Sequence, residues 1–137
     1  MNYITVEQFM GLSEEIRKVF IDWWQPKMHD LFLAKLGEIG DLKCCIGDKY
    51  TLEQITQNKG VNKFPLFRLD QLWEFISTRY KHIGVNNYSP TIEHYEWNVK
   101  LFKSMKQLEP DIEVTEKDLL QAFWEAAVLV AKEKVRG

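Results

Sequence analysis

The sequence predicts an α+β fold in which a small antiparallel sheet packs with about three helices. Three observations carry this prediction. Apolar residues recur with helical spacing over residues 69–80 and again over residues 120–131. Apolar and polar residues alternate strictly over residues 94–101, as in a strand with one buried face. Two short apolar runs, residues 30–36 and 42–46, flank a glycine-containing segment and predict a β-hairpin.

Length, composition and charge limit the class of protein. A chain of 137 residues has the length of one domain, and we expect residues 1–137 to fold as a single domain. The formal net charge of −2 argues against bulk phosphate binding, which needs clustered Lys and Arg side chains. No apolar run is long enough to cross a membrane, and the first residues do not form a signal peptide. We therefore expect a cytoplasmic protein.

Capping residues predict the first two helices. Thr5 and Gln8 fit a capping box, and Ser13 is a suitable N-cap for a longer helix. Trp23 and Trp24 are adjacent in that second helix, so their side chains diverge by about 100°. Either the small sheet covers both side chains, or one of them is exposed. If Trp24 is exposed, it is a candidate partner-binding residue, because exposed tryptophans often anchor protein interfaces.

The predicted hairpin contains the only two cysteines, Cys44 and Cys45. Neighbouring cysteines cannot form an unstrained disulfide, so we expect two thiols in a reducing compartment, at least one of them buried. Nothing at this position in a strand lowers a thiol pKa, and we predict no catalytic role, no metal site and no cofactor. We expect a short third strand at residues 49–52 and a polar loop over residues 53–63, with a helical turn over residues 52–56 as an alternative.

The central helix is predicted from Leu69 to Lys81, after Pro65 has stopped the preceding structure. Gly84 and the asparagines that follow it predict a turn after this helix. Tyr88 falls in that turn, where a side chain is difficult to bury, so Tyr88 is the second candidate partner-binding residue.

The strand over residues 94–101 is expected to pair with an edge of the hairpin. A capping motif at Thr115 precedes a last helix that runs to about Lys134. Apolar faces of three elements are expected to meet in one core formed by Trp73, Ile76, Tyr95 or Trp97, Phe123 and Trp124.

Two segments carry a resemblance. Trp24-Gln25-Pro26 and residues 64–76 resemble the W-x-P and PLLxxxQLxEFL-like motifs of small uncharacterised proteins that phages and prophages of Gram-positive bacteria encode. The order of elements is similar from Trp24 to the last helix. The resemblance implies a phage-type accessory protein in the cytoplasm of a bacterial host cell, and it implies no particular activity.

Searches for catalytic motifs in the sequence find no glycine-rich phosphate loop, no nucleophile elbow and no H-E-x-x-H. We therefore expect no enzyme, and predict a non-catalytic module that binds and modulates a host or defence protein. One alternative is a nucleic-acid-associated phage protein with residues 57–63, Arg68, Lys100 and Lys103 as its basic surface. A second alternative is a small enzyme of unknown reaction.

Overall fold

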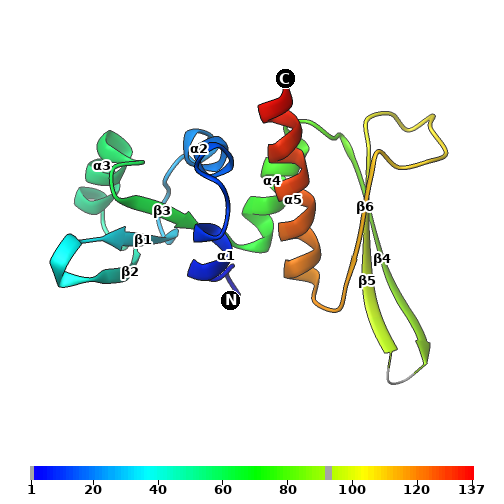
Figure 1. Ribbon diagram of the computed structural model, residues 1–137, viewed down its shortest axis with the longest axis horizontal. Coiled ribbons are helices and arrows are strands. Elements are labelled where there is room, and N and C mark those ends of the chain that lie inside the picture. The colour runs from blue at the N-terminus through cyan, green and yellow to red at the C-terminus, as the bar shows by residue number, and fades with distance from the viewer. Residues whose placement is uncertain (1, 92–93) are drawn as a thin grey trace. The chain divides into compact units, whose positions relative to one another are not determined.

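The computed structural model describes residues 2–91 and 94–137, and leaves the side chains of residues 88–91 and 94 undescribed. The chain divides into two compact units, an N-terminal unit, Tyr3–Phe67, and a C-terminal unit that contains Arg68–Gly137. Each unit has its own antiparallel three-stranded sheet and its own helices (Figure 1). The prediction of an α+β fold is confirmed. The prediction of a single sheet is wrong, because the strands form two three-stranded sheets, one in each unit. The expectation of a single domain stays a prediction.

The N-terminal unit contains the predicted hairpin. Its strands pair in the order β2-β1-β3, with Leu31 opposite Cys45 and Lys35 opposite Asp41 across the hairpin. The elements of the unit are α1 (Val6–Met10), α2 (Glu14–Trp23), β1 (Leu31–Lys35), the 3-10 helix η1 (Gly37–Ile39), β2 (Asp41–Cys45), α3 (Lys49–Asn58) and β3 (Lys63–Leu66).

The segment after the hairpin differs from the prediction. Residues 49–52 begin the helix α3 and do not form a strand, because the Asp48 carboxylate caps the Thr51 N–H at 2.7 Å and starts a helix there. The helix α3 continues to Asn58, so residues 52–56 are helical, and the loop before β3 is reduced to residues 59–62. The third strand is β3, and it includes Pro65. A proline is tolerated here because β3 is an edge strand, where one side of the backbone needs no partner.

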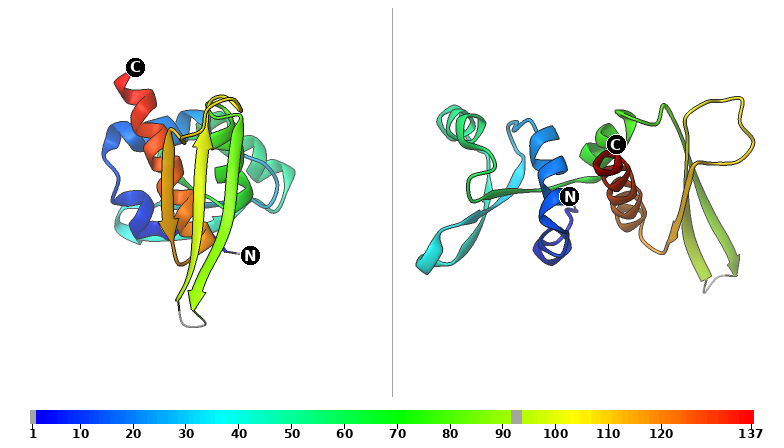
Figure 2. Two further views of the ribbon diagram at one scale, coloured as in Figure 1. Left: turned by 90° about the vertical axis from the view of Figure 1, so that its right-hand side faces the viewer. Right: turned by 45° about the horizontal axis from the view of Figure 1, so that its top comes forward.

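The C-terminal unit is built on a sheet with the order β4-β5-β6, and α5 packs against one face of it (Figures 1 and 2). The strand predicted over residues 94–101 is confirmed as β5, but β5 pairs with β4 and β6 and not with the hairpin. The elements of the unit are α4 (Leu69–Ser77), β4 (His82–Thr91), β5 (His94–Phe102), β6 (Ile112–Glu116) and α5 (Leu119–Arg136).

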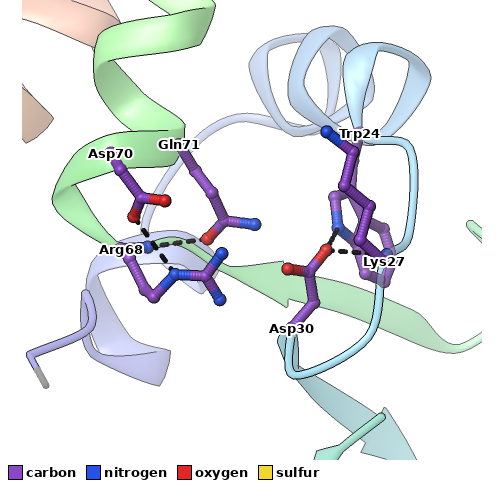
Figure 3. Close-up of polar contacts among 6 residues, drawn as sticks. All are labelled: Trp24, Lys27, Asp30, Arg68, Asp70 and Gln71. Carbon is purple, nitrogen blue, oxygen red and sulfur yellow. Dashed lines mark hydrogen bonds and ion pairs between the residues drawn. The ribbon is translucent and has the colours of Figure 1, made fainter.

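The start of α4 is fixed by a side chain in its first turn. The side-chain oxygen of Gln71 (Oε1) accepts a hydrogen bond from the Arg68 backbone N–H at 2.8 Å, and the Arg68 guanidinium contacts Asp70 at 3.1 Å (Figure 3). The hydrogen bond from Arg68 to Gln71 satisfies one backbone group that a helix start otherwise leaves unpaired. The helix ends at Ser77, four residues before the predicted end at Lys81.

Part of the predicted core is correct. Ile76, Phe123 and Trp124 are buried, whereas Trp73 is 42% exposed and Tyr95 is 48% exposed. Trp73 lies outside the core because Leu72, Phe75 and Ile76 form the buried face of α4, and Trp73 is rotated about 100° from Leu72. None of the helices in the described part of the chain has both the length and the apolar composition that a membrane span needs.

Candidate partner-binding groove

Trp24 is buried, with 1% of its surface exposed, so the structure does not offer it as an exposed anchor for a partner. Its indole N–H donates to the Asp30 carboxylate at 3.1 Å, and the Lys27 backbone N–H donates to the same oxygen at 3.0 Å (Figure 3). Trp24 packs on Phe32 of β1, with ring centroids 6.4 Å apart. The buried carboxylate gives the indole N–H an acceptor, which allows the whole side chain to enter the core. Trp24 is therefore covered and Trp23 is half-buried, so the alternative in which the sheet covers both side chains holds for Trp24 alone.

Tyr88 does not lie in a turn. Its backbone belongs to β4, where it pairs with Glu96 of β5, and its side chain is outside the part of the chain that the structure describes. The asparagines and the glycine that predicted a turn are instead held in the strand by pairing with β5, for example Gly84 with Lys100. Trp24 belongs to the N-terminal unit and Tyr88 to the C-terminal unit.

The two cysteines are free and neither is fully buried, which corrects the expectation that at least one is buried. Cys44 is half-buried and Cys45 is exposed, because β2 is an edge strand with most of its side chains at the surface. Partial burial raises the pKa of the Cys44 thiol above its ordinary value. This shift is opposite to the activation that a catalytic thiol needs.

The cations proposed as a nucleic-acid surface are engaged within the chain. The Lys59 ammonium group donates to the Trp24 carbonyl oxygen, and the Arg68 side chain, only 15% exposed, pairs with Asp70. Lys100 lies 3.9 Å from Glu113, and the Lys103 ammonium group lies 5.7 Å from the centre of the Tyr80 ring. These residues therefore do not present a continuous row of free positive charge to a phosphate backbone.

A groove of about 500 Å³ opens on the surface of the C-terminal unit. Three parts of the unit build it: one helix, the beginning of β4, and the end of β5 with the loop after it. Its volume falls within the range of ligand-binding clefts, roughly 300–1,000 Å³. The groove is lined by Trp73 of α4, by Lys81, His82, Ile83 and Gly84 at the beginning of β4, and by Phe102, Ser104, Met105 and Gln107.

Trp73 is the largest side chain of the groove and is held in a fixed position. Its ring stacks on Phe123 of α5, with centroids 5.4 Å apart and planes inclined by 29°. One side of the indole is thus fixed by the core, and 42% of the residue remains exposed. An aromatic side chain held in this way loses little conformational entropy when a partner covers it.

The loop that carries Met105 is ordered by its own polar contacts. The Asp111 carboxylate accepts the Lys103 backbone N–H at 2.9 Å and the Gln107 side-chain amide at 3.0 Å. The Asp111 backbone N–H donates to the Leu101 carbonyl oxygen at 2.8 Å, which closes the loop against β5. Met105 is 79% exposed on this loop and adds an adaptable apolar surface beside Trp73.

The lining of the groove contains few ionisable side chains. Lys81 and His82 are the ionisable residues among the lining side chains, and the lining includes no Asp or Glu. Ser104 is the only hydroxyl-bearing residue of the lining, and its hydroxyl oxygen accepts the Lys106 backbone N–H at 3.2 Å. Over residues 2–91 and 94–137, no group of three or more His, Cys, Asp or Glu side chains has the arrangement of a metal site. The groove is thus an apolar surface with a positively charged margin.

One strongly perturbed ionisable group lies beside this unit's core and outside the groove. Burial, with Glu133 as the second cause, raises the pKa of Tyr80 to about 12. The Tyr80 hydroxyl donates to the Glu133 carboxylate, which joins the segment between α4 and β4 to α5. A phenol with this pKa stays protonated at neutral pH and so remains a hydrogen-bond donor.

Comparisons of the chain with protein-family models, with curated protein sequences and with solved structures gave no match. The resemblance to phage-encoded proteins and the functions that it implies therefore stay predictions.

Sequence reasoning placed Trp73 in the core, although the sequence contains a sign of its exposure. The apolar residues of α4 cover a wide part of the helix circumference, because Phe75 lies outside the stripe that contains Trp73 and is also apolar. One core-facing stripe is narrower than this, so at least one of these apolar side chains has to face away from the core. The sequence alone does not say which one, since this depends on where α5 crosses α4.

Proposed function

We propose that the protein is a non-catalytic protein-binding module and that the groove around Trp73 is its docking site. The observation that carries this proposal is a tryptophan that stacks on Phe123, is 42% exposed and lies in the wall of an open groove of about 500 Å³. Binding energy at protein interfaces is concentrated in a few large side chains of this kind, surrounded by apolar contacts that exclude water.

The composition of the groove favours a segment of a protein over a nucleic acid. Ile83, Phe102 and Met105 give the groove an apolar lining, which suits an inserted aliphatic or aromatic side chain. A single-stranded nucleic acid would need several stacking aromatic rings along a groove of clustered cations. Here one tryptophan lines the groove, and Lys81 is its only side chain with a permanent positive charge.

The resemblance to phage-encoded proteins gives this proposal a biological setting. In that setting the partner is a host or defence protein of a bacterial cell, and the module acts by occupying a surface of it. This part of the proposal rests on the two motifs alone.

The experiment is affinity capture from bacterial lysate with the wild-type protein and two single variants, followed by titration of the purified partner. Trp73→Ala should weaken binding by about thirtyfold or more, which corresponds to about 2 kcal/mol. Tyr50→Ala is the matched control, because Tyr50 is an aromatic residue that is 72% exposed in the N-terminal unit. The control variant should bind like the wild type.

Two results would contradict the proposal. The first is equal affinity of Trp73→Ala and wild type for the captured partner while both remain folded. The second is capture of DNA or RNA with a strong dependence on salt and without a protein partner.

A further inference from the structure

Two aromatic rings form a corner on the β4–β5 hairpin of the C-terminal unit. Tyr95 and Trp97 of β5 have ring centroids 6.0 Å apart and ring planes at 89°. Tyr95 is 48% exposed and Trp97 is half-buried. Two perpendicular rings of this kind offer two faces of negative electrostatic potential to one ligand.

The strand register explains why this corner is open. Tyr95, Trp97 and Val99 occupy every second position of β5, so their side chains lie on the same face of the sheet. Val99 is buried on this face. The pairing of β5 with β6 ends at Trp97 and Glu116, so Tyr95 has no β6 residue beside it. The β4–β5 hairpin continues past the end of β6 as two strands (Figure 2).

Two carboxyl groups lie next to the corner. Glu116 is directly opposite Trp97 in the β5–β6 register, so the two side chains lie on the same face of the sheet. Glu125 of α5 lies close enough to Glu116 for the two carboxyl groups to interact. Partial desolvation, with Glu116 as the second cause, raises the pKa of Glu125 to about 7, although much of its side chain is exposed. Among the residues that the structure describes, neither carboxyl group forms an ion pair with a Lys or Arg side chain.

We propose that this corner, formed by Tyr95, Trp97, Glu116 and Glu125, binds the ammonium group of a lysine side chain from a partner protein. The ring faces attract a cation, and the carboxyl pair supplies the opposite charge that the chain itself leaves without a cation. A lysine fits better than an arginine, because a compact ammonium group can contact two perpendicular faces at once. A planar guanidinium group stacks on one face.

The site does not depend on the groove around Trp73, because it uses none of the groove's lining residues. A lysine that enters the corner can donate its N–H groups to the two carboxyl groups while its methylene stem covers the exposed part of Tyr95. Such a contact would add a charged anchor to whichever partner the module binds.

The test is an NMR titration of the full-length protein with Nα-acetyl-lysine methylamide at pH 8. Saturable shifts of the Trp97 indole N–H and of the Tyr95 ring are expected, with a dissociation constant in the millimolar range. The variants Tyr95→Ala and Glu125→Gln should each weaken binding about two- to fivefold, as expected from the loss of one cation–π or one charge contact. Glu53→Gln is the matched control, since Glu53 is an exposed acid of α3, and this variant should bind like the wild type.

Three outcomes would overturn the proposal. Nα-acetyl-norleucine methylamide, which has an uncharged side chain, could give the same shifts. Glu125→Gln and Glu53→Gln could weaken binding equally, which would mean a general attraction to negative charge. Tetramethylammonium could bind more tightly than the lysine derivative, which would mean a site for quaternary amines and not for a lysine that donates hydrogen bonds.

Discussion

The contact between Trp24 and Asp30 is predicted to be the most sensitive polar element of the N-terminal unit. Asp30 is 1% exposed, and one of its carboxylate oxygens accepts both the Trp24 indole N–H and the Lys27 backbone N–H. The substitution Asp30→Ala removes this acceptor and leaves a buried indole donor without a partner. The substitution Asp30→Asn keeps one acceptor oxygen, removes the charge and replaces the second oxygen by an NH2 group.

The expected loss of stability follows from these contacts. A buried donor left unsatisfied costs about 1–3 kcal/mol, and a hydrogen bond to a charged group contributes about 1.5–3 kcal/mol. The Lys27 side of the contact is only partly buried, so water can replace part of that bond. We therefore expect Asp30→Ala to lower the free energy of unfolding by about 2–4 kcal/mol, and Asp30→Asn by about 1 kcal/mol.

The assay is urea unfolding at pH 7, followed by circular dichroism, together with hydrogen exchange of the Trp24 indole N–H. Asp22→Ala serves as the control in the same unit. Asp22 pairs with Lys18 at 2.6 Å, but its side chain is 62% exposed, so its removal should cost less than about 0.5 kcal/mol. The reasoning is refuted if Asp30→Ala unfolds within about 0.5 kcal/mol of the wild type, or if its loss equals that of Asp22→Ala.

Three further predictions follow from burial and ionisation. Trp73→Ala should cost about 1–2 kcal/mol of stability and Phe75→Ala about 3–5 kcal/mol, because Phe75 is fully buried and Trp73 is not. Thermal unfolding of the two variants measures these losses, and equal losses would contradict the exposure of Trp73. Glu125 binds a proton more tightly in the folded state, with its pKa raised to about 7 from an ordinary 4.5, so its contribution to stability falls as pH rises from 4.5 through 7. Glu125→Gln should therefore be more stable than the wild type above pH 7, by less than about 1 kcal/mol because the residue is exposed, and equal to it below pH 4.5; a gain at low pH would contradict this. Iodoacetamide should modify Cys45 faster than Cys44 at pH 8, because burial raises the pKa of the Cys44 thiol; mass spectrometry of partly modified protein measures the ratio, and faster modification of Cys44 would count against it.

The sequence predicted the elements whose signal is local. The alternation along β5, the hairpin of β1 and β2 and the caps at Thr5 and Ser13 depend on neighbouring residues, and the structure confirms them. The strand β4 was missed because Gly84 and the following asparagines favour turns in isolation. Pairing with β5 overrides this preference, and such pairing is a tertiary effect.

The candidate site was harder to predict than the fold. The burial of Trp24 depends on Asp30, a partner six residues away whose carboxylate also had to be buried. The exposure of Trp73 depends on the position of α5, more than forty residues further along the chain. Helical periodicity gives the apolar arc of α4, but only the packing of α4 against α5 divides that arc into a buried part and an exposed part.

Photo-crosslinking from the groove tests the central proposal most directly. A photoreactive p-benzoylphenylalanine at Met105, which is 79% exposed in the groove, should form a discrete covalent conjugate with one protein in bacterial cells. The same group at Tyr50, which is 72% exposed in the other unit, should not form this conjugate. Adding Trp73→Ala to the Met105 probe should reduce the conjugate at least tenfold, given the expected loss of affinity. Equal yields from both probe positions, or a conjugate that persists without Trp73, would contradict the groove as the docking site.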